Sequence, residues 1–306
     1  MQFQQSYLKT FLLAVLAVAL SSCGGENAQK EGENAETSGA GGGEKRIVTL
    51  NATLTEIVFA LEAGDNVVGT DMSSKYPAPA AELPKVGYYR MVDAEKILGL
   101  KPTHALVVPE TGPEKVLNQL EEAGVQLQEF TLPEDPTKAP ELVRQVGEAI
   151  GAGEVAEQKA AAMEEQMNAL AAALEGQQQK PRVLCFYDRG GLDQLYLMGK
   201  GTVGGGFIEL AGGEQPLDFE GHKSITPEAV IDADPQYLIM PASTLEAFGG
   251  VQAVKDHKIL GQTTAAKEGN IITLEGPKLF GFGAHTAETA WELARKLGTV
   301  AEEEPA

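Results

Sequence analysis

Short apolar segments and amphipathic segments alternate along this chain from Arg46 to about residue 130, and the alternation begins again at Val183. Alternating strands and helices at this spacing are typical of parallel sheets covered by helices. Between the two regions, residues 154–174 carry a stripe of methionine and leucine, which indicates one long helix with its methionines in a core. We therefore predict an α/β fold, with two α/β lobes joined by a long linking helix.

This pattern predicts the individual elements and their limits. The expected strands are residues 47–50, 66–69, 105–108, 125–130, 183–187 and 237–240. The expected helices are one ending at residue 62 and capped by Thr53 or Thr55, then 94–100, 115–123, 141–150, 154–174, 204–211 and 228–233. The expected boundaries are 1–22 for a signal peptide, 23–45 for a flexible tether, 46–150 for the N-terminal lobe, 151–180 for the linking helix and 181–302 for the C-terminal lobe.

Two short stretches of the first half recur in the second half in the same order. Residues 92–108 resemble residues 225–240, which places Glu95 opposite Glu228, and FALEAGD resembles the later IELAGGE. Similarity this short also arises by chance, but two echoes in one order favour a duplicated architecture.

The N-terminus indicates export. Lys9 precedes an apolar run from Phe11 to Leu20, which ends in Leu-Ser-Ser-Cys23 followed by glycine. A short apolar core before small residues is typical of a secretory signal peptide, and a cysteine directly after them is typical of a bacterial lipoprotein. We expect Cys23 to be acylated, so that the protein is anchored to a membrane of the cell envelope. The alternative is an ordinary signal peptide with a chance cysteine.

Composition excludes some partners. The formal net charge is −20 and the sequence pI is about 4.6, which argues against nucleic-acid binding because that requires clustered cations. An anionic ligand would need a locally basic pocket. If Cys23 is lipidated, Cys185 remains alone in an apolar strand, and we expect a buried thiol and no intrachain disulfide.

The segment Gly87-Tyr-Tyr-Arg90 carries the first chemical signal. In an extended segment, Tyr88 and Arg90 would share one face. A guanidinium stabilises a neighbouring phenolate, and a tyrosine oxygen is a known axial ligand of haem iron. The alternative is a loop tyrosine that packs by its ring and leaves its hydroxyl in water.

The mature chain resembles the substrate-binding proteins of bacterial haem ABC importers, a group related to cobalamin and siderophore binders. The residues that carry the resemblance are Thr53–Glu56, Ala63–Asp65, Val68–Gly69, Tyr76–Pro77, Leu83–Tyr88, Arg90, Ala94–Glu95, Leu100–Pro102, Gly199–Thr202, Leu210–Gly213, Glu228–Ala229 and Leu279–Gly283. The resemblance implies a class III periplasmic-binding-protein fold, Tyr88 as the haem iron ligand and Arg90 as its support. It also implies that Glu95 and Glu228 contact the ABC transporter permease, although both glutamates also suit solvated helix starts.

None of the four histidines, His104, His222, His257 and His285, has a metal-binding spacing. His222 lies in the second-lobe counterpart of the Tyr88 loop, so it would reach the ligand as a distal iron ligand or a propionate contact. His285 stands where relatives often carry arginine. For both residues the alternative is plain surface exposure. Lys223 is expected to offset the propionates.

Residues Gly199–Gly204 match the dinucleotide pattern GxGxxG. An exported protein has no access to the cytoplasmic cofactor pool, so we interpret the motif as a helix N-terminus beside the cleft, with Lys200 receiving an anionic group. We expect no enzyme, but a lipid-anchored protein that binds haem and delivers it to an ABC importer. The alternatives are a cobalamin or ferric-siderophore binder of the same fold and, less favoured, an exported oxidoreductase.

Overall fold

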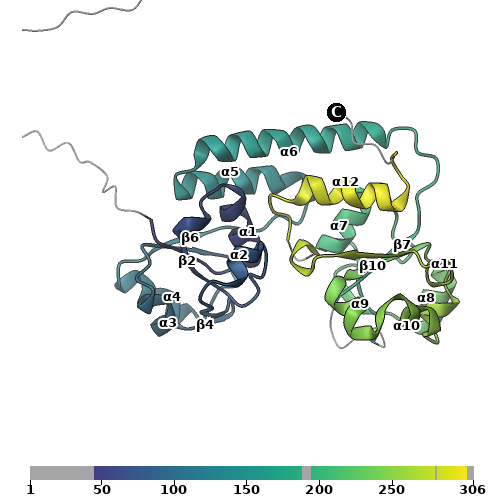
Figure 1. Cartoon of the computed structure of the whole chain (residues 1–306), viewed down its shortest axis with the longest axis horizontal. Helices are drawn as coiled ribbons and strands as arrows, with labels where there is room; N and C mark the ends of the chain where they lie inside the picture. The colour runs from purple at the N-terminus through teal and green to yellow at the C-terminus, as the bar shows by residue number, and fades with distance from the viewer. Residues whose placement is uncertain (1–44, 188–193, 280, 302–306) are drawn as a thin grey trace, which may run out of the picture. The chain divides into compact units, whose positions relative to one another are not determined.

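The structure is a computed structural model that describes residues 45–187, 194–279 and 281–301 (Figure 1). Cys23, the expected signal peptide and most of the expected tether lie outside these residues. The first lobe is built on a parallel sheet of strand order β2-β1-β5-β6. Its strands are β1 (Ile47–Thr49), β2 (Val67–Thr70), β5 (His104–Val107) and β6 (Gln126–Glu129). Its helices are α1 (Ala52–Ala60), α2 (Ala78–Ala81), α3 (Ala94–Gly99) and α4 (Glu114–Glu122).

The second lobe is built on a sheet of order β11-β10-β7-β8-β9. Its first three strands are parallel, whereas β8 pairs antiparallel with β7 and β9 pairs antiparallel with β8. Its strands are β7 (Val183–Phe186), β8 (Tyr196–Met198), β9 (His222–Ser224), β10 (Tyr237–Pro241) and β11 (Ile271–Leu274). Its helices are α7 (Val203–Leu210), α8 (Pro227–Ala233), α9 (Ala242–Phe248), α10 (Gly250–Asp256), α11 (Thr264–Glu268) and α12 (Thr286–Leu297). As predicted, Cys185 is buried, and burial raises the pKa of its thiol to about 12.

The two lobes are joined through α5 (Ala139–Ile150) and α6 (Gly153–Ala173), and Figure 1 shows α6 running along α5 and α12. Met163 and Met167 are buried, which confirms them as core residues. Each such side chain contributes about 1.5–3 kcal/mol of hydrophobic burial. The indole of Trp291 in α12 donates to the Gln166 carbonyl at 2.9 Å. Within the described ranges, no helix combines the length and the apolar character needed to cross a membrane.

The start of α1 differs from the prediction. Asn51, not Thr53 or Thr55, is the N-cap, and its side-chain oxygen accepts from the Thr53 amide at 2.8 Å. Asn51 has an extended backbone, with φ −168°, whereas both threonines are buried within the helix. An asparagine at this position leaves the Thr55 hydroxyl free for other partners.

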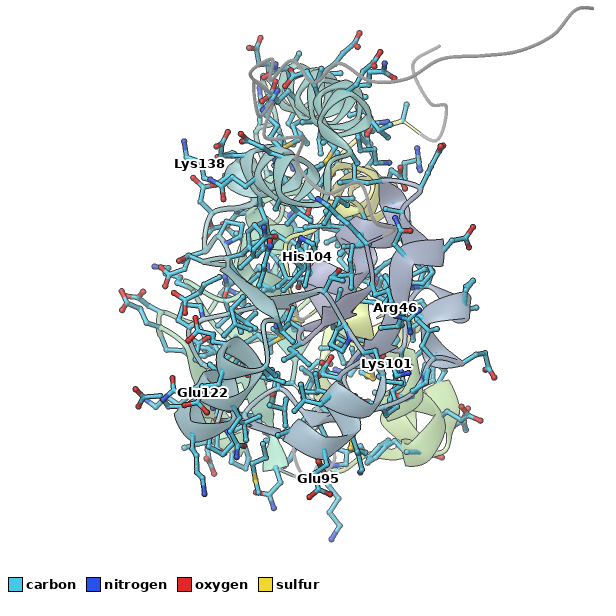
Figure 2. All side chains as sticks on the ribbon, turned by 90° about the vertical axis from the view of Figure 1, so that its left-hand side faces the viewer. Arg46, Glu95, Lys101, His104, Glu122 and Lys138 are labelled. Carbon is cyan, nitrogen blue, oxygen red and sulfur yellow. The ribbon has the colours of Figure 1, made fainter. Side chains whose placement is uncertain are left out.

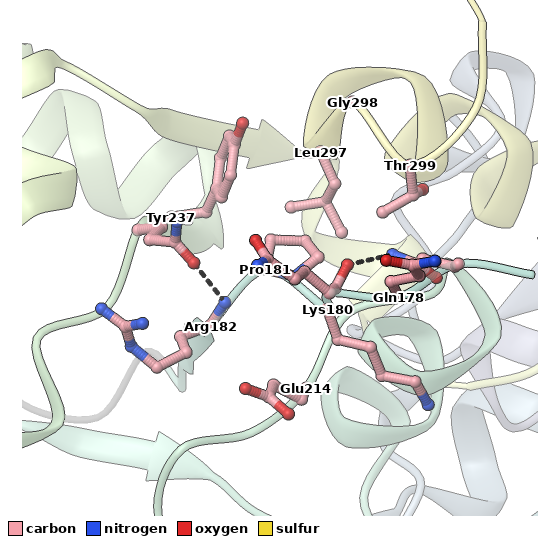
Figure 3. Close-up of a pocket in the computed structure, with 12 residues that line it drawn as sticks. Gln178, Lys180, Pro181, Arg182, Glu214, Tyr237, Leu297, Gly298 and Thr299 are labelled. Carbon is pink, nitrogen blue, oxygen red and sulfur yellow. Dashed lines mark hydrogen bonds between the residues drawn. The ribbon is translucent and has the colours of Figure 1, made fainter.

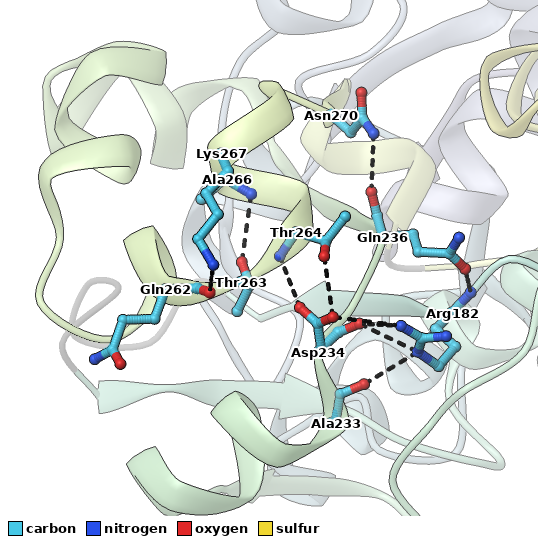
Figure 4. Close-up of polar contacts among 10 residues, drawn as sticks. All are labelled: Arg182, Ala233, Asp234, Gln236, Gln262, Thr263, Thr264, Ala266, Lys267 and Asn270. Carbon is cyan, nitrogen blue, oxygen red and sulfur yellow. Dashed lines mark hydrogen bonds and ion pairs between the residues drawn. The ribbon is translucent and has the colours of Figure 1, made fainter.

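The two lobes share an arginine contact that the sequence comparison did not identify. In the first lobe, Arg46 donates to the carbonyls of Leu100 and Lys101 at 2.8 and 3.0 Å (Figure 2). In the second lobe, Arg182 donates to the carbonyls of Ala233 and Asp234 at 3.2 and 2.7 Å (Figure 4). Each arginine directly precedes the first strand of its lobe and holds the turn between a helix and the next strand.

Those two turns share an uncommon backbone conformation. Lys101 has φ 51° and Asp234 has φ 36°, and a proline follows each. Asp234 also accepts from the amide and hydroxyl of Thr264 at 2.7 and 2.9 Å. The backbone hydrogen bond from Thr264 is the main reason why the pKa of Asp234 is lowered. The turn is therefore tied to α11 as well as to the start of β7.

Candidate functional site

Tyr88 lies in a short extended strand, but the extended segment predicted through Arg90 turns back after Tyr88 into a tight hairpin. Strands β3 (Gly87–Tyr88) and β4 (Met91–Val92) pair antiparallel, so Tyr88 is opposite Met91 and the turn is formed by Tyr89 and Arg90. Gly87 permits this fold because its φ is 114° and an added Cβ would lie 2.5 Å from the Met91 carbonyl oxygen. The hairpin leaves Tyr88 58% exposed, so its phenol is available to a ligand.

A cavity of about 790 Å³ is lined by residues of both lobes, a size typical of small-molecule sites. The first lobe contributes Tyr76, Tyr88 and Arg90, and the second contributes Tyr187 and His222. Apolar side chains complete the walls: Met72, Leu132, Met198, Val203 and Leu279. The cavity therefore combines flat aromatic and apolar surfaces with a few polar groups.

The first-lobe side of the cavity carries two cations. Arg90 lies over the Tyr89 ring, 5.3 Å from its centroid. Lys75, which the sequence analysis missed, also lines the cavity. Among the described residues, neither cation has an ion pair or a side-chain hydrogen bond. Both are available to an anionic ligand, and two carboxylates, Glu110 and Glu275, line the same cavity.

The tyrosines of the cavity differ in their surroundings. Burial raises the pKa of Tyr76, and the nearby carboxylates of Glu56, Glu288 and Glu275 raise it further. Tyr76 therefore remains a neutral phenol, because its anion would be poorly solvated and close to negative charge. Tyr88 is the better candidate for a phenolate ligand, since it is solvated and close in sequence to Arg90.

His222 reaches the cavity from β9. Its ring packs against that of Tyr187, with centroids 4.5 Å apart, and stacks on Tyr196 at 6.4 Å. His222 is exposed, so the alternative of surface exposure holds for this residue, although it also lines the cavity. Desolvation of its ring lowers its pKa, which favours the neutral imidazole, the form that binds metals. Within the described ranges, no group of three or more His, Cys, Asp or Glu side chains is arranged to hold a bare metal ion.

The remaining predicted cations are not part of the cavity lining. Lys200 donates to the Asp218 carboxylate at 2.6 Å on the surface. Lys223 is exposed on β9, where it is the neighbour of His222. The GxGxxG segment ends in an ordinary helix start, because the Thr202 hydroxyl oxygen accepts from the Gly205 amide at 3.1 Å. Val203 of the same helix does line the cavity.

His285 is only 6% exposed, so the alternative of surface exposure is wrong for this residue. Its Nδ1 lies 3.4 Å from Glu56 of α1. The same carboxylate accepts from the Ala284 amide at 2.9 Å. A Cβ on Gly283 would lie 2.2 Å from that carboxylate oxygen, so a glycine is needed for this close approach. A buried polar contact therefore connects α1 of the first lobe to the segment that precedes α12.

Glu95 and Glu228 occupy equivalent places in the two lobes. They lie in the first turns of α3 and α8, after the N-caps Asp93 and Thr226, and both are exposed. Figure 2 shows Glu95 at the end of its lobe, directed away from the protein. The position suits a surface contact and equally suits favourable interaction with the helix dipole.

A second hollow, of about 630 Å³, lies where the chain leaves α6 and enters the second lobe (Figure 3). Its walls are mostly polar, and several of their groups bond to one another. The side-chain amide of Gln177 donates to the Gln179 carbonyl at 3.0 Å, and the backbone amide of Arg182 donates to the side-chain oxygen of Gln236 at 3.0 Å. It contains none of the residues expected to bind a ligand.

Comparison with known proteins identifies the family. The sequence profile described as periplasmic binding protein matches residues 47–277. The structure is similar to the periplasmic heme-binding protein RhuT from Roseiflexus sp. RS-1 in apo form, with a TM-score of 0.76 and 34% identity. That similarity covers 83% of this chain and 98% of the other.

Two relatives in sequence point to transport. The uncharacterized ABC transporter substrate-binding lipoprotein YvrC of Bacillus subtilis (strain 168) is 24% identical over 245 residues, which are 77% of this chain and 76% of that protein. The vitamin B12-binding protein of Vibrio vulnificus (strain YJ016) is 36% identical over 83 residues, which are 27% of this chain and 30% of that protein. The chain belongs to the periplasmic binding protein family, whose members are substrate-binding proteins of ABC transport and not enzymes.

Proposed function

We propose that this protein is an exported lipoprotein that binds haem in the cavity between its lobes and delivers it to an ABC importer. The observation that carries the proposal is the pair of iron donors on opposite lobes: the exposed phenol of Tyr88 and the imidazole of His222, which both line the cavity. The similarity to the RhuT structure supports the same ligand.

The cavity matches the chemistry of haem in three respects. A phenolate at Tyr88 is a hard oxygen donor for ferric iron, and His222 supplies a nitrogen donor from the facing lobe. Apolar residues such as Met72, Met198 and Leu279 cover the porphyrin faces. The carboxylates of haem are balanced by Arg90, and Lys200, Lys223 and His285 have no direct part in this arrangement because none of them lines the cavity.

Delivery depends on parts of the chain that lie outside the cavity. Acylated Cys23 and the tether of residues 23–45 keep the folded part close to the membrane that holds the importer. Glu95 and Glu228 then dock onto cations of the ABC transporter permease. Replacing both glutamates by alanine is expected to abolish uptake and leave haem affinity unchanged, and unchanged uptake would refute the docking role.

A haemin titration of the purified protein tests the ligand. The wild type is expected to give a ferric spectrum with a phenolate charge-transfer band, which Tyr88→Phe loses with at least about tenfold weaker binding, equivalent to 1.4 kcal/mol. Tyr76→Phe is the matched control and is expected to keep the band. The proposal fails if the spectrum remains that of free haemin.

Vitamin B12 is the second candidate ligand, because the Vibrio vulnificus relative is named for it. Cobalamin carries amides in place of the carboxylates of haem, so Arg90 and Tyr88 would contribute little to its binding. Tight cobalamin binding that is insensitive to Tyr88→Phe, together with no haemin binding, would establish this alternative.

A further inference from the structure

Behind the cavity wall, the first lobe contains a buried polar network that the proposed ligand site does not use directly. Its members Thr49, Thr55, Thr70, Asp71 and Ser74 each have no exposed surface. Buried polar groups are costly unless they are hydrogen-bonded. Here they bond to one another and to Lys85, which is partly buried.

Lys85 connects three separate segments through one ammonium group. It donates to the Thr70 hydroxyl at 2.7 Å, to the Ser74 carbonyl at 2.7 Å and to the Ala80 carbonyl at 2.8 Å. These three acceptors use all of its donors. Burial lowers the pKa of Lys85. The acceptors lie at the end of β2, in the loop after it, and in α2.

Asp71 is the carboxylate acceptor at one end of the network. Its carboxylate accepts from the hydroxyl of Ser74 at 2.6 Å, and from the amide of Ser73 at 3.0 Å. The hydroxyls of Ser74 and Thr55 lie 2.7 Å apart, and the Thr55 hydroxyl also donates to the Asn51 carbonyl at 2.9 Å. The loop is therefore held by the carboxylate of Asp71 and by the ammonium of Lys85, which donates to the Ser74 carbonyl.

The segments held in this way are the ones that form the first-lobe wall of the cavity. Met72, Ser73, Lys75 and Tyr76 of the loop all line the cavity. The Met72 amide donates to the Gly87 carbonyl at 2.9 Å, which joins the loop to the hairpin of Tyr88. Lys85 lies in the short stretch between this loop and that hairpin.

We propose that Lys85 is a positioning residue of the ligand site, which holds the loop of residues 71–76 and the Tyr88 hairpin in one arrangement before the ligand binds. Lys85 does not touch the ligand; it acts through the loop. Residues of this kind commonly change ligand affinity by about 10–100-fold when they are replaced. The effect on affinity rests on the proposed function, whereas the effect on the loop does not.

The test compares Lys85→Met with Arg46→Met in the full chain. Arg46→Met is the matched control, because Arg46 also donates to two backbone carbonyls of the first lobe but lies outside the cavity lining. Amide hydrogen exchange is measured without ligand, and haemin affinity is measured by titration. Lys85→Met is expected to accelerate exchange selectively at Met72 and Ser73 and to weaken haemin binding roughly tenfold, while Arg46→Met does neither.

The outcomes separate this inference from the proposed function. Unchanged exchange at the loop, or acceleration that Arg46→Met reproduces, overturns the positioning role, as does accelerated exchange with unchanged haemin affinity. If the wild type does not bind haemin, the proposed function fails and the exchange measurement still decides whether Lys85 orders the loop. If Lys85→Met does not fold, Ser74→Ala removes the link between Asp71 and Thr55 and is expected to give the same selective exchange.

Discussion

Replacing Glu56 by alanine tests the buried contact between α1 and the segment before α12. The variant removes a carboxylate that accepts from the Ala284 amide at 2.9 Å and lies 3.4 Å from His285 Nδ1. A hydrogen bond to a charged group contributes about 1.5–3 kcal/mol, and its loss leaves a buried amide without an acceptor. We expect Glu56→Ala to lower the free energy of unfolding by about 2–3 kcal/mol. For a protein of this size the melting temperature should fall by roughly 5–10 °C.

Glu56→Gln separates the charge from the hydrogen bond. The amide oxygen of glutamine can still accept from Ala284, so the expected loss is about 1 kcal/mol. Thermal unfolding followed by circular dichroism measures both variants, with Glu122→Ala on exposed α4 as the control that stays within about 0.5 kcal/mol of the wild type. The reasoning is refuted if Glu56→Ala melts with the control, or if Glu56→Gln is the less stable of the two Glu56 variants.

Three further predictions use the same structure. Gly283→Ala should destabilise the protein by at least about 1 kcal/mol because its Cβ meets the Glu56 carboxylate, whereas Gly99→Ala, with open space around it, should not; urea unfolding compares them. The pKa of Asp234 is lowered in the folded state, so the ionised carboxylate stabilises the protein above pH 3.8, and this stabilisation is lost as the pH falls through the folded-state pKa. The difference in melting temperature between the wild type and Asp234→Asn should therefore shrink as the pH falls below 3.8, and a constant difference would contradict this. Lys75→Ala should weaken haemin binding about two- to fivefold, the contribution of an exposed ion pair, and more at low salt than at high salt, while Lys96→Ala on α3 should have no effect in the same titration.

Much of the fold follows from local sequence patterns. The strands and helices around the two echoes, α3 with β5 and α8 with β10, lie close to their predicted limits because apolar periodicity is a local property. The two arginines that hold the equivalent turns were detectable in principle, since Arg46 and Arg182 each directly precede a strand. Their role was missed because an arginine before a strand has no distinctive spacing.

The errors have physical causes that lie outside local patterns. The Tyr88 segment is a hairpin because Gly87 takes a positive φ, which the strand pattern does not encode. The first helix is capped by Asn51 and begins at Ala52, so Thr55 lies inside the helix, where its hydroxyl joins a buried network. His285 is buried because it packs against Glu56, which is remote in sequence. Lys75 was not predicted as a ligand contact, because nothing in the sequence distinguishes a lysine in a loop that lines a cavity from one in any other loop.

Periodicity, composition and short motifs are properties of the sequence, and they suffice to predict two α/β lobes joined by a long helix and an acidic protein. They also indicate Tyr88, Arg90 and His222 as candidate ligand contacts. The folded chain was needed to show that Tyr88 and His222 line one cavity and that Lys200 is paired with Asp218 outside it. Residues from different lobes are brought together by long-range packing, such as that of α6 against α5 and α12, and such packing is a property of the whole folded chain.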